Sequence, residues 1–477
     1  MKMFVDEKWR AGARRIAVTS PWSGETLDEV PDADDAAAEA ALACAARGAK
    51  VMARMTAHAR YEILLRAADL CAARAETLAQ TLSAETGKPI TEARTEAGRG
   101  AELLRLAAFE GSQLRGETLP LDAAPNAADK FGFTLRAPCG VVVAITPFNF
   151  PLLLVLHKIA PALASGNSVI LKPASATPLC ALQLTEILLE AGLPGNALQC
   201  ITGGGGRLGK ILCSDKRVRK ISFTGSTEVG EAITACAGIK KLSLELGSAS
   251  PTLIMADADL EQAAAATAVG GYVNAGQVCI SLQRVLVERP VYADYLDAVR
   301  APVEGIAVGA PQDEATALSA MIAEREAARV EGWVNEAVAG GARLVTGGGR
   351  DGAVLQPTVV ADVTPAMRLF RDEVFGPAVA VTPVQDFRDA LRHANDSRYG
   401  LSASLFTRDI TCAMRFARAV ESGNVHLNWT PLWRADLMPY GGVKNSGIGR
   451  EGVRYAVEEM TEIKNVVVHG VGVEDVD

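Results

Sequence analysis

The sequence lacks the runs that mark a membrane protein or a nucleic-acid-binding protein. No stretch approaches the roughly 18 consecutive apolar residues of a membrane helix, and residues 1–8 lack the apolar core of a signal peptide. No dense Lys/Arg run occurs in the 477 residues, and the formal net charge is −8. We therefore predict no membrane span and no electrostatic support for binding nucleic acid.

Cysteine and histidine are too scattered to suggest a disulfide framework or a zinc site. The nine cysteines form no CxxC pair, and the five histidines lack ligand spacing. We expect reduced thiols, a cytoplasmic setting and no bound metal. Aromatic residues make up only 5% of the chain, which disfavours a large hydrophobic substrate tunnel.

The chain is too long for one hydrophobic core, so two or three domains are expected. From residue 140 onward strands alternate with helices, beginning with a β-branched run at 140–145 that is typical of a strand buried on both faces. This alternation predicts a doubly wound parallel sheet with its ligand site at the carboxyl ends of the strands. A second α/β region is expected from Pro251 onward.

Long Ala-rich helices are predicted before this sheet, and a different pattern follows them. Two charged residues of these helices, Glu85 and Arg94, are expected on a solvated face. Residues 115–138 instead suggest two extended segments, which form either a surface hairpin or an arm that pairs with another subunit. The tail at 462–468 is expected to be a strand that can pair with this arm.

The stretch 272–281, Tyr-Val-Asn-Ala-Gly-Gln-Val-Cys-Ile-Ser, holds a candidate nucleophile. Cys279 stands where an Ala-rich helix, a turn and a β-like run meet, so its thiol can be presented into a cleft. The alternative is the common one, a free cysteine that serves as a small buried hydrophobe. A catalytic thiol also needs an oxyanion donor, a base and an acceptor for electrons or an acyl group.

Two polar residues at predicted strand ends can supply part of this chemistry. Asn149 lies between two Phe and two Pro directly after the first strand of the sheet. It is either a turn residue or a side-chain amide held as an oxyanion donor. Glu245 lies among apolar residues, where burial raises a carboxyl pKa toward the range of a general base. Its alternative is a structural carboxylate paired with the backbone.

Signals for a dinucleotide are present without the GxGxxG fingerprint. Lys172 at a strand end can bind ribose hydroxyls or phosphate, and the turn at 223–230 precedes a helix N-terminus that suits a pyrophosphate. The Gly-rich turn at 203–206 is either a second such site or a flexible loop. Glu373 and Phe375 suit a ribose diol and a ring contact, although a simple turn also explains them.

Taken in order, these motifs resemble those of the NAD(P)-dependent aldehyde dehydrogenase superfamily over residues 3–469. The stretches that carry the resemblance are Pro-Phe-Asn-Phe-Pro (147–151), Lys-Pro-Ala-Ser (172–175), Phe-Thr-Gly-Ser-Thr (223–227), Leu-Glu-Leu-Gly (244–247), Gly-Gln-Val-Cys (276–279), Glu-Val-Phe-Gly-Pro (373–377) and the segment 439–452. Ser248 departs from the second glycine that the family usually has there, and it puts no catalytic role in doubt. The segment 433–440 looks most like the lactaldehyde, non-phosphorylating glyceraldehyde-3-phosphate and phosphonoacetaldehyde dehydrogenase branches.

The resemblance implies a mechanism and a set of site residues. Cys279 would be the nucleophile, Asn149 the oxyanion donor, and Glu245 the base that hydrolyses a thioester to the carboxylic acid. NAD or NADP would accept the hydride. The implied cofactor contacts are Thr146, Pro147, Phe148, Lys172, Ala174, Ser175, Gly205, Gly209, Phe223, Gly225, Ser226, Val229, Leu246, Glu373 and Phe375.

The resemblance also implies how the chain is divided and assembled. It implies a dinucleotide-binding domain of residues 1–114 and 139–246, and a catalytic domain of residues 247–441. Residues 115–138 and 460–477 would form an oligomerisation arm in a homodimer or homotetramer.

Substrate and cofactor preference are the least determined features. Ser175 stands where relatives that favour NAD often carry Glu, so acceptance of NADP is expected. Arg434, Arg105 and His157 are candidate contacts for a small polar or anionic aldehyde, although His157 also fits a packed helix residue. The alternatives are a CoA-acylating semialdehyde dehydrogenase, which should not need Glu245, and a non-catalytic binding protein on the same fold.

Overall fold

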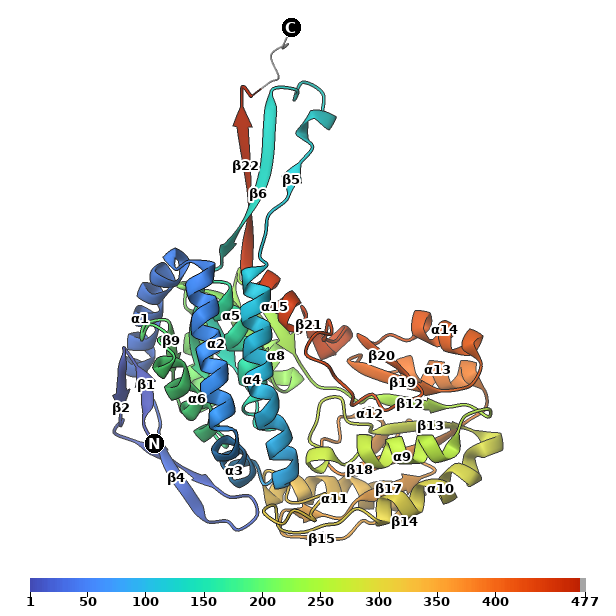
Figure 1. The fold of residues 1–477 in the computed structure, drawn as a ribbon. Helices are drawn as coiled ribbons and strands as arrows, with labels where there is room; N and C mark the ends of the chain where they lie inside the picture. Colours follow the sequence, from blue (N-terminus) through green and yellow to red (C-terminus); the bar gives the residue numbers. More distant parts are fainter. Residues whose placement is uncertain (472–477) are drawn as a thin grey trace.

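The computed structural model describes residues 1–471, and it has two α/β units and a projecting arm (Figure 1). The first unit is built on an eight-stranded sheet whose five central strands, β9-β8-β7-β10-β11, run parallel, as predicted. In spatial order its strands are β2 (Lys8–Arg10), β1 (Met3–Val5), β9 (Leu198–Cys200), β8 (Ser168–Lys172), β7 (Val141–Ile145), β10 (Val218–Thr224), β11 (Lys241–Glu245) and β21 (Gly447–Ile448).

Helices cover both faces of this sheet, because its strands are apolar on both sides. Val142 and Ala144 of β7 belong to one core, whereas Val141, Val143 and Ile145 belong to the other. The helices that share the first core are α2 (Ala57–Ala73), α3 (Ala75–Thr86), α4 (Ile90–Ser112), α5 (Leu153–Ala164), α6 (Leu179–Glu190) and α15 (Val453–Glu459). Those of the second are α1 (Asp35–Arg54), α7 (Gly205–Ser214) and α8 (Thr227–Ala237).

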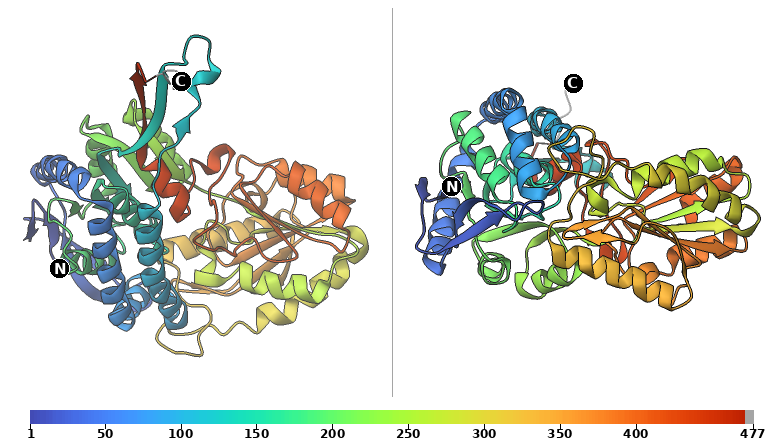
Figure 2. Two further views of the ribbon diagram at one scale, coloured as in Figure 1. Left: turned by 45° about the horizontal axis from the view of Figure 1, so that its top comes forward. Right: turned by 90° about the horizontal axis from the view of Figure 1, so that it is seen from below.

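The second unit is a seven-stranded sheet with its own core. In spatial order its strands are β14 (Arg343–Thr346), β17 (Thr358–Ala361), β18 (Ala378–Val384), β13 (Arg284–Glu288), β12 (Pro251–Ile254), β19 (Ser402–Phe406) and β20 (Asn424–Leu427). The helices packed around it are α9 (Leu260–Gly270), α10 (Tyr292–Glu304), α11 (Glu324–Ala339), α12 (Arg368–Arg371), α13 (Phe387–Asn395) and α14 (Ile410–Ala419). Figure 2 shows the two units side by side from two further directions. In residues 1–471, no helix has the length and apolar character needed to cross a membrane.

Glu85 corrects one expectation, because it is buried rather than solvated. It lies near the end of α3, and its carboxylate accepts backbone N–H groups from Leu179 and Cys180 at 2.8 and 3.0 Å. These are free N–H groups at the start of α6, which need an acceptor from outside the helix. Burial raises the pKa of Glu85 to about 8. Arg94 is exposed, as expected, and pairs with Glu76 and Glu314.

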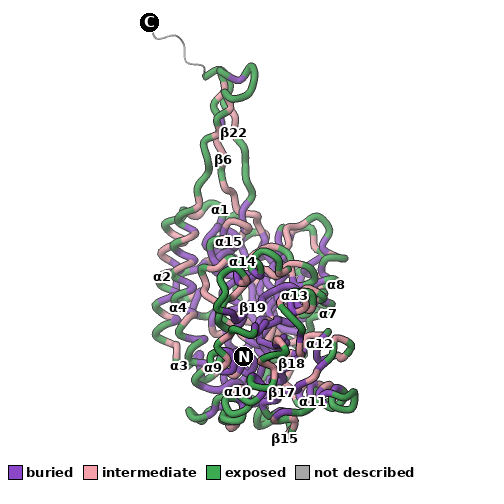
Figure 3. Tube along the Cα trace, turned by 90° about the vertical axis from the view of Figure 1, so that its right-hand side faces the viewer, coloured by how far each residue is buried: buried purple, intermediate pink, exposed green. Residues whose placement is uncertain are grey.

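The predicted pairing of the C-terminal strand with the arm is confirmed. β22 (Thr461–His469) pairs antiparallel with β6 (Lys130–Pro138) along its whole length, and β5 (Thr118–Leu119) adds a third strand. Figure 3 shows that this ribbon projects from the body and is mostly exposed or half-buried. The remainder of the predicted arm segment, residues 472–477, lies outside the described residues.

One face of the ribbon carries a row of apolar side chains, so subunit association remains the prediction for the arm. The apolar side chains on this face are Phe131, Phe133, Leu135, Val466 and Val468, and three of them are at least 39% exposed. Exposed apolar strand surface of this kind favours pairing with another copy.

Replacing Leu135 with Asp should therefore reduce the molar mass measured by light scattering to that of a monomer. His469→Asp, on the opposite face of the ribbon, should keep the parent's mass; a parent-like mass for Leu135→Asp would contradict the prediction.

Candidate active site

Two cavities meet at Cys279, at the junction of the two units. One, of about 560 Å³, lies along the carboxyl ends of β10 and β11. The other, of about 310 Å³, lies between α4, α5 and the segment around Arg434. Asn149 and Cys279 are the two residues that line both cavities. A small molecule in either cavity can therefore reach the same thiol.

The larger cavity contains seven of the predicted cofactor contacts. The predicted residues that line it are Pro147, Phe148, Gly225, Ser226, Leu246, Glu373 and Phe375. Ser226 caps α8 by accepting the Val229 N–H, so the neighbouring N–H groups of the first turn lie at the cavity edge. Thr146 and Thr224 bury hydroxyls that have no hydrogen-bond partner among the described residues. These unpartnered donors and acceptors fit a polar ligand such as a dinucleotide.

Several other predicted cofactor contacts lie at the end of β8 and beside it on α7. The Lys172 ammonium donates to Pro173 O at 3.0 Å, and a Cβ on Gly205 would lie 3.8 Å from it. The Ser175 hydroxyl donates to Gly203 O at 2.8 Å. Burial lowers the pKa of Lys172 to about 8. Ala174 follows Lys172, Gly209 lies further along α7, Val229 is exposed on α8, and Phe223 is buried in β10.

The loop before Cys279 has a backbone that most residues avoid. Asn274, Ala275 and Gly276 all have positive φ angles, of 52°, 52° and 69°. At Gly276 a Cβ would lie 2.2 Å from the Gly376 carbonyl, so a larger residue cannot fit. Such a conformation persists only when surrounding contacts hold it. Here the Glu92 carboxylate accepts the Asn274 N–H at 3.0 Å.

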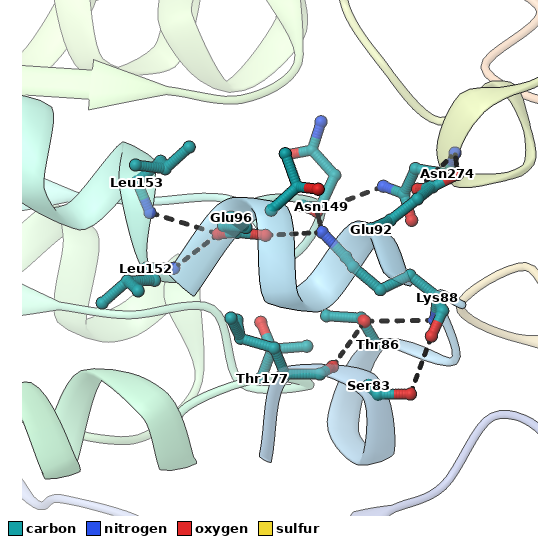
Figure 4. A network of polar contacts seen from close by, with 12 residues as sticks. Ser83, Thr86, Lys88, Glu92, Glu96, Asn149, Leu152, Leu153, Thr177 and Asn274 are labelled. Carbon is teal, nitrogen blue, oxygen red and sulfur yellow. Dashed lines mark hydrogen bonds and ion pairs between the residues drawn. The ribbon is translucent and has the colours of Figure 1, made fainter. Parts of the chain in front are cut away.

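Asn149 joins this loop to the N-terminal helices. Its side-chain amide donates to Gln277 O at 2.8 Å, and its backbone carbonyl accepts from the Asn274 amide at 3.1 Å. The same carbonyl accepts from the Lys88 ammonium at 2.7 Å (Figure 4). Because an amide NH₂ has two hydrogens, the second remains for a ligand at Cys279.

Lys88 is held by a buried carboxylate, a feature that the sequence did not suggest. Its ammonium pairs with Glu96 at 2.6 Å, and both side chains are at most 1% exposed. Glu96 also accepts the N–H groups of Leu152 and Leu153, at the start of α5. The pair therefore fixes the segment around Asn149 from two sides, as Figure 4 shows.

Glu245 lies at the end of β11, as predicted, but it lines neither cavity in this structure. It is 3% exposed, and neither carboxylate oxygen has a hydrogen-bond partner among the described residues. Burial raises the pKa of this carboxyl well above its usual range, and the negative charge of Glu451 acts in the same direction. A carboxyl in such surroundings takes up a proton readily, which suits a general base.

The smaller cavity contains two of the three predicted substrate residues. Arg434 donates to Glu451 at 3.3 Å and to His157 Nδ1 at 3.4 Å, while its buried Nε has no partner in the described chain. His157 is buried, and its Nε2 lies 3.2 Å from the Asp436 carboxylate. Burial lowers the pKa of His157, so the ring is neutral at pH 7.

The structure corrects the prediction for Arg105, the third candidate substrate residue. Arg105 lies on the surface of α4, where it pairs with Asp69. Its side chain is 46% exposed and does not line the smaller cavity. Arg99 lies on the same helix and lines the cavity instead, where it pairs with Asp436 at 2.6 Å. Helical spacing alone did not reveal which arginine of α4 lines the smaller cavity, because this depends on contacts with residues on the other side of the cavity.

Tyr440 is a further site residue that sequence reasoning missed. Its hydroxyl lies 3.0 Å from the Cys279 sulfur, and the Arg434 guanidinium lies 3.8 Å from its ring centroid. The only sequence signal was its place in the segment 439–452, which carries the resemblance but does not indicate a role for the phenol.

The fold and this arrangement define an aldehyde dehydrogenase. The model of the aldehyde dehydrogenase family matches residues 9–466, and the chain belongs to that family. It is an NAD(P)-dependent oxidoreductase that acts on small aldehydes.

Among its relatives, the 3-sulfolactaldehyde dehydrogenase of Priestia aryabhattai is 44% identical and covers 98% of each chain. The lactaldehyde dehydrogenase of Methanococcus aeolicus is 38% identical over 98% of this chain and 100% of its own. The glyceraldehyde-3-phosphate dehydrogenase GapN of Methanocaldococcus jannaschii, solved in complex with NADP, has a TM-score of 0.93 and 38% identity. That alignment covers 96% of this chain and 100% of the GapN chain.

Loss of the buried Lys88 ammonium should lower both the stability of the fold and the activity of the enzyme. Lys88→Met leaves the Glu96 carboxylate buried without its cation, which should lower the free energy of unfolding by about 3–5 kcal/mol. It should also lower kcat, because the carbonyl of Asn149 loses a donor. Urea unfolding and steady-state kinetics measure the two effects. Arg94→Met removes an exposed cation nearby on α4 and should change neither quantity appreciably; equal effects of the two variants would refute this account.

Proposed function

We propose that this enzyme oxidises a small anionic aldehyde to the carboxylic acid through a thioester on Cys279. The observation that supports it is the junction of the two cavities at Cys279 and Asn149. This junction lets one cavity hold the dinucleotide and the other the aldehyde, with the thiol between them. When bound, the dinucleotide supplies the acceptor for the hydride that leaves the substrate carbon.

The first half of the reaction depends on Cys279 and Asn149. The thiolate adds to the aldehyde carbon and forms a thiohemiacetal, whose oxygen becomes negative. The free N–H of the Asn149 amide and the Cys279 backbone N–H bind that oxygen. Removal of one such donor typically costs about 3–4 kcal/mol of transition-state stabilisation. Loss of hydride then leaves a thioester on the sulfur.

The second half depends on Glu245. Its carboxylate takes a proton from a water molecule, whose oxygen attacks the thioester carbon. The C–S bond breaks, the electron pair returns to Cys279, and the acid leaves. Both oxygens of Glu245 are unpartnered in the described chain, so no hydrogen bond has to break when the carboxylate takes part in this step.

Two arginines of the smaller cavity support an anionic substrate. Arg434 and Arg99 both line this cavity, and the Arg434 Nε has no hydrogen-bond partner among the described residues. Guanidinium groups bind sulfonate, phosphate or carboxylate oxygens through charge-assisted hydrogen bonds. The relatives 3-sulfolactaldehyde dehydrogenase and glyceraldehyde-3-phosphate dehydrogenase act on aldehydes with an anionic group on carbon 3. We infer a three-carbon 2-hydroxyaldehyde of this kind, with 3-sulfolactaldehyde as the leading candidate.

The residues around Lys172 support NADP as an accepted cofactor. Ser175 presents a hydroxyl where a carboxylate would repel a 2′-phosphate, and Lys172 offers a cation at the same strand end. The proposed role of Glu373 in binding a ribose diol is supported by its position in the lining of the larger cavity, where it accepts the Ser248 N–H at 2.9 Å.

Arg434→Ala tests the substrate class. The variant should lower kcat/KM for 3-sulfolactaldehyde roughly 10- to 100-fold more than for uncharged lactaldehyde, because a hydrogen bond to a charged group is worth about 1.5–3 kcal/mol. The ratio of kcat/KM for 3-sulfolactaldehyde to kcat/KM for lactaldehyde cancels any effect of the substitution that is common to both substrates. Initial rates of NAD(P)H formation provide the measurement.

Arg105→Ala is the matched control, because this arginine lies outside the cavity. The ratio of its kcat/KM values for the two aldehydes should equal that of the parent. An equal loss on both aldehydes in Arg434→Ala would show that the arginine does not recognise the anion.

The pH dependence tests the NADP assignment. Because the pKa of Lys172 is lowered to about 8, its ammonium is present below that pH and lost as the pH rises through it. The ratio of kcat/KM with NADP to that with NAD should therefore fall roughly tenfold between pH 7 and pH 9. A ratio that does not change with pH, or that is below about one hundredth at pH 7, would contradict a role for Lys172 in binding a 2′-phosphate.

A further inference from the structure

The phenol of Tyr440 is the polar group in direct contact with the reactive sulfur. Its hydroxyl lies 3.0 Å from Cys279 Sγ, and Tyr440 is 3% exposed. Among the described residues, that sulfur is the only hydrogen-bond partner of the hydroxyl. A neutral thiol can accept or donate in this contact, but a thiolate has no proton. In the reactive state the phenol must therefore be the donor.

The ring cannot easily turn away from the thiol. The guanidinium of Arg434 lies 3.8 Å from the ring centroid, and this cation–π contact holds the ring from one side. Arg434 is itself held by Glu451, which pairs with the buried Lys158 at 2.7 Å. The backbone of Tyr440 pairs with Glu451 in both directions, at 3.0 and 2.6 Å. The phenol thus belongs to a fixed buried cluster rather than to a mobile loop.

The surroundings of Cys279 otherwise oppose ionisation. Burial raises the pKa of its thiol to about 12, and the negative charges of Glu373 and Glu245 act in the same direction. The hydrogen bond from Tyr440 is the largest effect that lowers it, followed by the charge of Arg434. A nucleophilic thiol needs thiolate character near neutral pH, so these two groups are the ones that favour the reactive form.

We propose that Tyr440 is a further catalytic residue, whose O–H donates to the Cys279 thiolate, with Arg434 as the positioning residue that holds its ring. The same donor acts twice in the proposed reaction. Before attack it stabilises the thiolate nucleophile. In thioester hydrolysis, when the C–S bond breaks and the electron pair returns to sulfur, it stabilises the leaving thiolate. The inference rests on the proposed role of Cys279 as nucleophile.

Tyr440→Phe isolates the hydroxyl, because the ring, its packing and the stacked guanidinium all remain. The probe is iodoacetamide, applied to the enzyme alone over a range of pH, without aldehyde or dinucleotide. Alkylation of the peptide that carries Cys279 is measured by mass spectrometry. The half-buried Cys412 in the same digest is the internal reference, since it lies far along the chain on α14 and outside both cavities.

Loss of the donor should move the alkylation profile of Cys279 upward by about one to two pH units, and slow alkylation at neutral pH about tenfold or more. Cys412 should be unchanged. Tyr292→Phe removes a phenol hydrogen bond to Asp362, away from both cavities, and should leave the Cys279 profile as in the parent. The kcat/KM of Tyr440→Phe should fall at neutral pH and recover at higher pH, which a merely structural role would not produce.

An unchanged Cys279 profile in Tyr440→Phe would overturn the inference. That outcome is separate from failure of the proposed function, because alkylation requires no aldehyde oxidation. If the parent failed to oxidise anionic aldehydes, the substrate assignment would fall, and the shift of the alkylation profile would still decide whether Tyr440 stabilises the thiolate.

Discussion

The active site depends on one constraint, the left-handed loop that places Cys279 beside Asn149. Three successive positive φ angles are unfavourable on their own, and they persist because the loop is tied at several points. Glu92 holds the Asn274 N–H, and Asn149 exchanges hydrogen bonds with the loop through both its side chain and its backbone. The N-terminal helices thereby fix the position of Cys279, the proposed nucleophile, which belongs to the second unit, so neither unit alone contains the whole proposed site.

Two groups of buried charges hold the segments around the thiol. Lys88 and Glu96 fix the Asn149 segment, while Lys158, Glu451 and Arg434 fix the other side of the thiol. Pairs of this kind add little net stability, because desolvation offsets much of their attraction. What they supply is geometry, since a buried side chain held by several polar partners has one favourable position. Cys279 and Asn149 are thus held without blocking the two cavities that they line.

The sequence predicted the parts of the fold and site that local pattern controls. Runs of β-branched residues indicated the parallel sheet, and strand ends indicated Asn149, Glu245 and the cofactor turn. It did not reveal Tyr440 or the Lys88–Glu96 pair, because their partners are distant in the chain and either residue alone looks ordinary. Glu85 was expected on the surface for the same reason: its partners are backbone N–H groups of α6, which carry no sequence signal. Likewise, Arg99 is the arginine of α4 that faces the smaller cavity because it pairs with Asp436, which is more than 300 positions away in the chain.

Among the residues that the structure describes, the two cavities share only Asn149 and Cys279, and this separation bears on how such enzymes diversify. Every other side chain that lines the smaller cavity comes from α4, α5, Phe150 just before α5, the loop that carries Cys279 or the segment 432–440, and none of these side chains lines the larger cavity. Mutations can therefore alter the charge and shape of the smaller cavity without changing the lining of the larger one. Relatives named for sulfonated, phosphorylated and uncharged three-carbon aldehydes are the outcome expected of such evolutionary modularity.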